Sequence, residues 1–287
     1  MTSSEVEPLV STRWLASCLG NARVRIIDIR SVVDGGARAA YEGAHVPGAI
    51  HTDYAKDGWR ATKGMATGLL PDAAFLSGLF GRLAVTPANH VVIVSAGTSA
   101  GDFAAAARVY WTFKVAGHCA VSILDGGMAA WMQAGLPVDV GPGTAPEQSS
   151  YPVAPDPSYR AGLPAVETAL ADASAILLDS RATSYFEGRE KSPQALRPGR
   201  LPGALQLDHA TAFDKTAQRL KPLAELQRLF AVVPDKPVVN YCNTGHQAAT
   251  NWFILSELLG RRGATLYDGS MSEWTESAAR AVATGPG

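Results

Sequence analysis

VVNYCNTGHQAATNWFILSELLG, residues 238–260, has the pattern of a buried strand, a tight loop and a helix. The β-branched run that opens it is typical of a parallel strand buried on both faces. The helix is expected over about 246–259, ending at Gly260, a residue that favours a helix end. VVIVSAGTSAGDF, residues 91–103, repeats this order before a second helix at about 100–116. The segment therefore indicates an α/β fold in which mainly parallel strands alternate with helices.

Other segments occur twice as well. IIDIR (26–30) recurs as LLDSR (177–181), HVPGAI (45–50) as RLPGAL (200–205), and LDGGMAAW (124–131) as YDGSMSEW (267–274). The offset between the copies lies between 143 and 155 residues, far longer than a solenoid repeat, so the chain is predicted to be a duplicated domain. Each copy should hold a mainly parallel sheet flanked by helices.

Domain limits follow from composition. Gly, Pro and Ser crowd residues 135–158 and interrupt the apolar periodicity, which is typical of an extended linker. We expect a first domain at 1–138, a linker at 139–158 and a second domain at 159–287. Within the second domain, PLAELQRLF (222–230) predicts an amphipathic helix whose apolar face carries Leu223, Leu226, Leu229 and Phe230.

Composition excludes several classes of protein. Of 287 residues, 47% are hydrophobic and 18% are charged, which is typical of a globular chain and excludes a disordered one. A net charge of −1 argues against a nucleic-acid binder. Three cysteines without metal-ligand spacing argue against a disulfide scaffold or a zinc site. With neither a secretory signal nor a long apolar run in view, we expect a cytoplasmic protein that does not contact membranes, as a monomer or weak oligomer.

Cys242 is the candidate nucleophile. It follows the predicted strand 238–241 and precedes a helix, at the edge of an open α/β sheet where ligands bind. The backbone N–H groups of a tight loop and the positive end of a helix favour a thiolate, which is the reactive form of cysteine. Asn243, Thr244, Gly245, His246 and Gln247 complete this loop. In the first copy the residue that corresponds to Cys242 is Ser95, so we expect one active site, in the second half.

With these motifs the chain resembles the tandem-domain rhodanese family of thiosulfate and 3-mercaptopyruvate sulfurtransferases. The resemblance rests on Asp-x-Arg, [HR]-x-Pro-Gly-Ala, Cys-x-x-Gly and Asp-Gly-[GS]-x-x-x-Trp, in order and duplicated except for the cysteine. It implies a persulfide on Cys242 that carries sulfur from a small anionic donor to a thiol or cyanide. It also implies that neither a metal nor an organic cofactor is needed.

The loop departs from the family pattern. Rhodaneses that favour thiosulfate carry basic residues directly after the cysteine, where this chain has Asn243 and Thr244. The mercaptopyruvate enzymes have Gly and Ser there, so Thr244 would keep the serine's hydroxyl role. In their proposed Ser–His–Asp set, Asp53 fits the aspartate, but the histidine position falls near Gly68.

The family's substrate arginines also have no direct counterpart. They would correspond to Tyr185 and about Gln194, with Arg189, Lys191 and Arg197 close enough to substitute. Arg181 has a counterpart in the half without the cysteine, which favours a structural ion pair. The candidate substrate-binding residues are therefore Arg181, Tyr185, Arg189, Lys191, Asp53, Trp59 and Arg60. Residues that occur in both halves are interpreted as structural: Trp131 and Trp274 in packing, Asp125 and Asp268 in turns.

Three alternatives stay open beside the sulfurtransferase. Related folds with Cys-x₅-Arg are phosphatases, but Ala248 stands at the sixth position after Cys242, which argues against that activity. A non-catalytic binding module with the rhodanese fold is the second. A carrier that delivers sulfur to a specific acceptor protein is the third.

Overall fold

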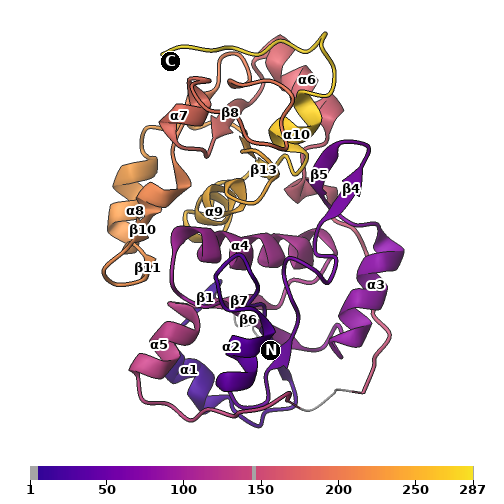
Figure 1. Cartoon of the computed structure of the whole chain (residues 1–287), viewed down its shortest axis with the longest axis vertical. Coiled ribbons are helices and arrows are strands. Elements are labelled where there is room, and N and C mark those ends of the chain that lie inside the picture. Colours follow the sequence, from indigo (N-terminus) through magenta and orange to yellow (C-terminus); the bar gives the residue numbers. More distant parts are fainter. Residues whose placement is uncertain (1–5, 144–146, 287) are drawn as a thin grey trace. The chain divides into compact units, whose positions relative to one another are not determined.

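The computed structural model describes residues 6–143 and 147–286, which form two compact units. Unit 1 comprises the described parts of residues 1–59 and 71–156, together with 214–220. Unit 2 comprises residues 60–70 and 157–213, and the described part of 221–287. Figure 1 follows the chain through both. The proposed limits at 138 and 159 stay a prediction, but residues 60–70 and 214–220 each lie in the unit formed mainly by the other half.

Unit 1 contains a five-stranded sheet in which every pair of neighbours is parallel. In order across the sheet the strands are β1 (Leu9–Val10), β7 (Val121–Leu124), β6 (His90–Val94), β2 (Val24–Asp28) and β3 (Ile50–His51). The helices are α1 (Thr12–Ser17), α2 (Ala37–Gly43), α3 (Ala73–Arg82), α4 (Ala100–Val115) and α5 (Gly127–Gln133). The predicted strand at 91–94 and helix at about 100–116 are confirmed.

Unit 2 contains a four-stranded parallel sheet. Its strands are, in order, β13 (Ala264–Leu266), β12 (Val238–Tyr241), β8 (Ile176–Asp179) and β9 (Leu205–Gln206). The α-helices are α6 (Leu163–Asp172), α7 (Thr183–Phe186), α8 (Leu223–Phe230), α9 (Ala248–Phe253) and α10 (Ser270–Trp274). Short 3₁₀ turns form at Pro157–Tyr159 and His209–Ala212. The α/β class with mainly parallel sheets is confirmed.

The predicted helix after Cys242 forms with one irregularity. α9 continues as a π-helical turn over Ile254–Leu258, and Gly260 follows with φ of +63°. This left-handed conformation is one that glycine adopts without steric cost, and it ends the helix where the sequence predicted.

Two short hairpins lie wholly or mainly in the unit that is formed by the other half of the sequence. β4 (Ala61–Lys63) pairs antiparallel with β5 (Ala66–Leu69), and both belong to unit 2 although they precede most of unit 1 in the chain. β10 (Phe213–Asp214) pairs with β11 (Arg219–Leu220), and residues 214–220 belong to unit 1. Each half of the sequence thus contributes a hairpin segment to the unit formed mainly by the other half.

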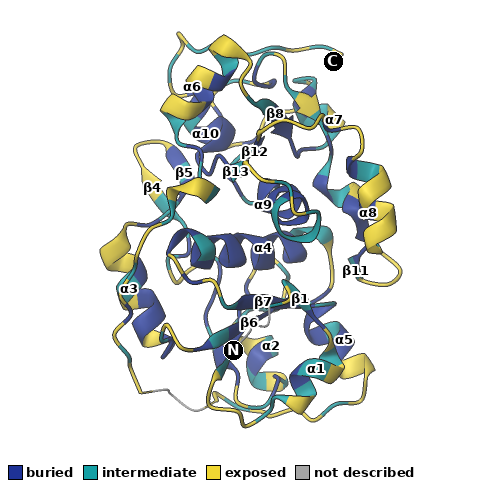
Figure 2. Cartoon of the chain, turned by 180° about the vertical axis from the view of Figure 1, so that it is seen from behind, coloured by how far each residue is buried: buried dark blue, intermediate teal, exposed yellow. Residues whose placement is uncertain are grey.

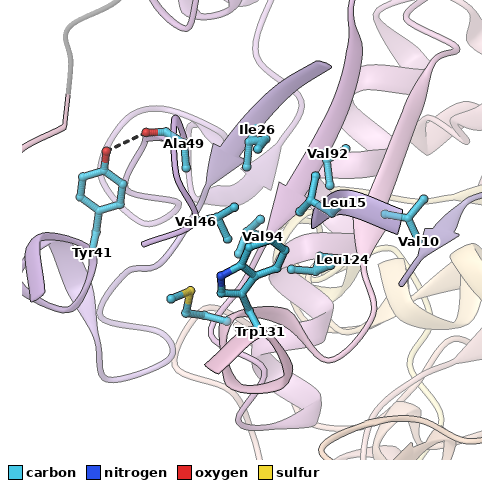
Figure 3. Close-up of a cluster of buried hydrophobic side chains, with 11 residues drawn as sticks. Val10, Leu15, Ile26, Tyr41, Val46, Ala49, Val92, Val94, Leu124 and Trp131 are labelled. Carbon is cyan, nitrogen blue, oxygen red and sulfur yellow. Dashed lines mark hydrogen bonds between the residues drawn. The ribbon is translucent and has the colours of Figure 1, made fainter. Parts of the chain in front are cut away.

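One hydrophobic cluster of unit 1 forms where side chains of α1, α2 and α5 meet strands β1, β2, β6 and β7 (Figure 3). Trp131 is fully buried there, and its indole N–H donates to the carbonyl oxygen of Pro137 at 2.8 Å. Trp274 is likewise buried in unit 2, and its indole N–H donates to the carbonyl oxygen of Ala281 at 2.9 Å. Both tryptophans therefore have the packing role that the sequence predicted.

Helix α8 forms where the sequence predicted an amphipathic helix. Leu226 and Phe230 are buried, but Leu223 is 50% exposed and Leu229 is only half-buried, and Figure 2 shows the exposed side of this helix. The predicted helix is therefore confirmed, and its apolar face is buried at Leu226 and Phe230, while Leu223 in the first turn remains largely in solvent. In the part of the chain that the structure describes, no helix is long and apolar enough to cross a membrane.

Candidate active site

Cys242 lies where the sequence analysis placed it, directly after the central strand β12 and six residues before α9. Its side chain is buried, with 1% exposed. Of the other predicted loop residues, Gly245 is buried, and the remaining four, Asn243, Thr244, His246 and Gln247, are half-buried. The loop therefore presents polar side chains at its rim and the sulfur beneath them.

A serine side chain organises the backbone of this loop. The hydroxyl of Ser270 accepts the N–H groups of Cys242 and Gly245, each at 3.0 Å, and donates to the carbonyl oxygen of Tyr267 at 2.7 Å. Ser270 has φ of +50°, a conformation that costs a non-glycine residue about 1 kcal/mol. The strain is offset by three hydrogen bonds in a fully buried position. Ser270 is thus a site residue that sequence analysis missed.

The backbone N–H groups of the two residues after Ser270 also bind the cysteine loop. Met271 donates its N–H to the carbonyl of Cys242 at 3.1 Å, and Ser272 donates to that of Asn243 at 2.9 Å. Unit 1 has the same pair of bonds, from Met128 to Ser95 at 2.8 Å and from Ala129 to Ala96 at 2.9 Å. The loop and its support were therefore duplicated together, and the side chains distinguish the two copies.

Arg181 approaches the cysteine loop through Asn243. Its guanidinium forms a bidentate, buried ion pair with Asp179, at 2.6 and 2.9 Å, and its Nη1 donates to Oδ1 of Asn243 at 3.2 Å. Arg30 in unit 1 forms the same pair with Asp28, but its Nη1 donates to a backbone carbonyl. The ion pair is structural in both units, as the sequence favoured, and only in unit 2 does it reach the loop.

Asp179, Tyr241 and Cys242 all influence the pKa of Arg181. Burial acts to lower the pKa of Arg181, but the hydrogen bonds and charge of Asp179, with smaller contributions from Tyr241 and Cys242, hold that pKa above its ordinary value. Burial raises the pKa of Tyr241 well above its ordinary value, so its hydroxyl stays neutral. Arg181 therefore carries a permanent positive charge, which reaches the cysteine loop through Asn243.

In unit 1 the corresponding loop is filled by its own carboxylate. Asp102 accepts the N–H groups of Ala96, Gly97 and Thr98 at 3.0, 2.5 and 3.2 Å. Burial raises the pKa of Asp102 to about 6, against the lowering effect of these bonds. Ala249 stands at the corresponding position of unit 2 and cannot accept them. The loop N–H groups that could hold an external anion are thus satisfied internally in unit 1.

The hairpin β4–β5 also contacts the cysteine loop. Gly68, with φ of +88°, lies so close to Thr244 that a methyl group added at Gly68 would overlap the Thr244 carbonyl oxygen and approach its Cβ to 2.9 Å. The sequence analysis placed the family's histidine position near Gly68. A histidine side chain does not fit there in this structure.

The predicted cations beyond Arg181 have structural partners. Arg189 is exposed and pairs with Glu187 at 2.7 Å. Lys191 donates to the carbonyl of Ala195 at 2.8 Å, and Arg197 to those of Ser277 and Arg280. Tyr185 is half-buried in α7. A substrate role for these residues stays a prediction.

Asp53 and Trp59 belong to unit 1 and have local roles there. Asp53 accepts the N–H of Ala55 at 2.9 Å, and the indole N–H of Trp59 donates to Thr52 Oγ1 at 3.0 Å. Arg60 is grouped with unit 2. Their contribution to the substrate site stays a prediction.

Asp268 has more than the turn role that the sequence indicated. Its carboxylate accepts two hydrogen bonds from Arg160, both at 2.9 Å, and the N–H of Leu70 at 2.6 Å. Two signals in the sequence could have exposed the missed residues. Serine replaces the second glycine of Asp-Gly-Gly at position 270, and Ser99-x-x-Asp102 has the spacing of a capping box. Among the described residues, no group of three or more His, Cys, Asp and Glu side chains could hold a metal ion.

Comparisons with known proteins identify the family of this chain. The rhodanese-like domain family matches residues 11–134 and 164–277. Human 3-mercaptopyruvate sulfurtransferase is 31% identical over 93% of this chain and 91% of its own length. A thiosulfate sulfurtransferase of Corynebacterium glutamicum is 30% identical over 97% and 91%. The crystal structure of SseA from Escherichia coli, described as a 3-mercaptopyruvate sulfotransferase with the rhodanese fold, matches with a TM-score of 0.79 at 25% identity, covering 92% of this chain and 98% of that one. With two matched domains and relatives along nearly its whole length, this chain belongs to the rhodanese family.

Proposed function

We propose that this chain is a sulfurtransferase that moves a sulfane sulfur from thiosulfate or 3-mercaptopyruvate to a thiophilic acceptor through a persulfide on Cys242. The observation that carries the proposal is the position of Cys242 at the carboxyl end of β12, in a loop whose N–H groups are held by Ser270. The names of the relatives support the choice of donors.

The first half-reaction loads the cysteine. The Cys242 thiolate attacks the outer sulfur of thiosulfate, the S–S bond of the donor breaks, and sulfite leaves with the electron pair. With 3-mercaptopyruvate the C–S bond breaks instead, and the carbon that leaves takes up the thiol proton to give pyruvate. Either donor leaves a persulfide anion on Cys242, which the loop N–H groups and the charge of Arg181 stabilise.

The second half-reaction restores the enzyme. Cyanide or a thiolate attacks the outer sulfur of the persulfide, and the Cys242 thiolate leaves with the electron pair of the S–S bond. Cyanide becomes thiocyanate, and a thiol becomes a persulfide. Thr244, at the rim of the loop, is the hydroxyl that would polarise the donor, and Asn243 links the loop to Arg181.

The test is mass spectrometry of the purified chain after incubation with each donor, followed by cyanide. We expect Cys242 to gain the mass of one sulfur atom and to lose it again as thiocyanate forms, while Cys242→Ser does neither and keeps the melting temperature of the parent protein. Retained turnover in Cys242→Ser would exclude the mechanism. A persulfide that forms but is not passed to small acceptors would favour a carrier for a specific protein, and a chain that never loads would favour a binding module.

A further inference from the structure

Segment 60–70 of the sequence folds against the loop that carries Cys242, although the two are about 175 residues apart. Backbone groups of this segment form hydrogen bonds with side chains of the C-terminal part of unit 2. Met65 donates its N–H to Oε1 of Glu276 at 2.8 Å, Thr67 exchanges bonds with the hydroxyl of Ser272 at 2.9 and 3.2 Å, and Leu70 donates to Asp268 at 2.6 Å.

The residues that hold the hairpin also hold the cysteine loop. Ser272 is fully buried, bonds Thr67 through its hydroxyl, and donates its N–H to the carbonyl of Asn243 at 2.9 Å. Asp268 belongs to the same turn as Ser270, whose hydroxyl accepts the N–H of Cys242. Hairpin, turn and cysteine loop are therefore joined by a continuous set of hydrogen bonds.

Gly68 is the point where the hairpin contacts the loop directly. A Cβ atom built there overlaps the carbonyl oxygen of Thr244 and lies 2.9 Å from its carbonyl carbon, closer than real Cβ atoms approach backbone. The φ of +88° would strain any L side chain as well. The hairpin can therefore lie against the Thr244 peptide only because position 68 carries no side chain.

We propose that Gly68 is a positioning residue for Cys242: its bare backbone supports the Thr244 peptide and holds the cysteine loop in its closed, buried arrangement. This inference rests on the proposed sulfurtransferase function. A displaced loop would move the N–H groups and the sulfur apart, and a displacement near 1 Å can reduce a reaction rate about 100-fold.

The experiment compares Gly68→Ala with Gly64→Ala. Both glycines have positive φ, at +88° and +62°, and both lie in the hairpin, but a Cβ at Gly64 meets only the Glu276 carboxylate, at 3.3 Å. The two variants should therefore share the conformational cost in stability. We expect Gly68→Ala to lose roughly 10- to 100-fold in the rate constant of persulfide formation, with a smaller change in KM, and Gly64→Ala to stay within about twofold of the parent.

A second readout does not depend on sulfur transfer. Alkylation by iodoacetamide, followed site by site with peptide mass spectrometry, should become several-fold faster at Cys242 in Gly68→Ala, while the exposed Cys119 reacts at the parent rate. If no donor loads the parent protein, the proposed function fails, and the alkylation rates still decide the role of Gly68. Equal effects of the two alanine substitutions, or no effect of either, would overturn the inference.

A third variant tests the support of the loop by the hairpin without changing a glycine of the hairpin. Ser272→Ala removes both side-chain bonds to Thr67, together with the bond to the Gly269 carbonyl oxygen, and keeps the N–H that binds the Asn243 carbonyl. If the hairpin supports the loop, this variant should also load more slowly and expose Cys242 to alkylation, with a smaller change than Gly68→Ala. Unchanged loading and alkylation in a folded Ser272→Ala protein would contradict the support that we infer.

Discussion

The hydroxyl of Ser270 accepts the backbone N–H of Cys242 at 3.0 Å, and it does so from a left-handed conformation with φ of +50°. Gly127, its counterpart in unit 1, has a similar φ of +56° without a side chain. A Cβ there would meet the carbonyl oxygen of Ser95 at 2.5 Å. The two units therefore share a backbone turn, and only the one beside the cysteine adds a hydroxyl to it.

Two substitutions of Ser270 should separate strain from hydrogen bonding. Ser270→Ala loses the hydroxyl and keeps the strain, so its free energy of unfolding should fall by about 1–3 kcal/mol. Ser270→Gly loses the same bonds but relieves the strain, and should be about 1 kcal/mol more stable than the alanine variant. Both should load sulfur at least about tenfold more slowly than the parent, because the loop N–H groups lose their common acceptor. Urea unfolding and single-turnover persulfide formation check this, and full activity in either variant would contradict it.

The paired arginines offer a matched control for the ion pair. Arg181→Lys and Arg30→Lys each remove a bidentate bond to a buried aspartate, so each should lower the free energy of unfolding by about 1–3 kcal/mol. Only Arg181→Lys should slow persulfide formation, because only Arg181 reaches the cysteine loop through Asn243. Stopped-flow loading with thiosulfate measures this. Equal losses of rate would mean that both arginines act through stability alone.

Thr244 should influence the two donors differently. If its hydroxyl polarises 3-mercaptopyruvate or relays its proton, Thr244→Ala should lose more turnover with that donor than with thiosulfate, by on the order of tenfold. Thr244→Ser keeps a hydroxyl and should restore the mercaptopyruvate rate. Steady-state formation of thiocyanate and pyruvate checks both variants, and parallel losses with the two donors would exclude the role.

Acidic pH should destabilise unit 1 through His118. Burial lowers the pKa of this histidine from 6.5 to about 4, and its Nδ1 lies 3.0 Å from the hydroxyl of Tyr151. The unfolded chain binds a proton at a pH where the folded chain does not, so this contribution to stability is present above about pH 6.5 and is lost towards pH 4. Over that window it amounts to roughly 3 kcal/mol.

The check is urea unfolding of the parent and of His118→Gln across this range. The variant cannot titrate at position 118, so the difference in stability between the two proteins should shrink as the pH falls. A difference that stays constant would contradict the assignment. Asp102, whose pKa is raised to about 6, acts in the opposite direction within the same window, which is why the comparison is between the two proteins.

Local sequence patterns predicted the elements that surround the cysteine. The strand before Cys242, the helix end at Gly260 and the buried pair of Trp131 and Trp274 follow from hydrophobic periodicity, glycine and duplication, which depend on residues close together in the chain. Leu223 shows the limit of this reasoning: its spacing places it on the apolar face of α8, but it is 50% exposed, because distant segments decide whether a core reaches that position.

Sequence by itself determined that this protein has two α/β copies, that the second carries the thiol, and that both repeat the Asp-x-Arg motif. Tertiary structure alone decided what surrounds the thiol. Segment 60–70 joins unit 2 because its hydrogen-bond partners, Asp268, Ser272 and Glu276, lie about 200 residues further along the chain. Asp102 fills the loop of unit 1 because its carboxylate, in the first turn of α4, accepts three N–H groups of that loop at once. Hydrogen bonds such as these form between groups that lie close together only after folding. Their positions along the chain therefore do not reveal them.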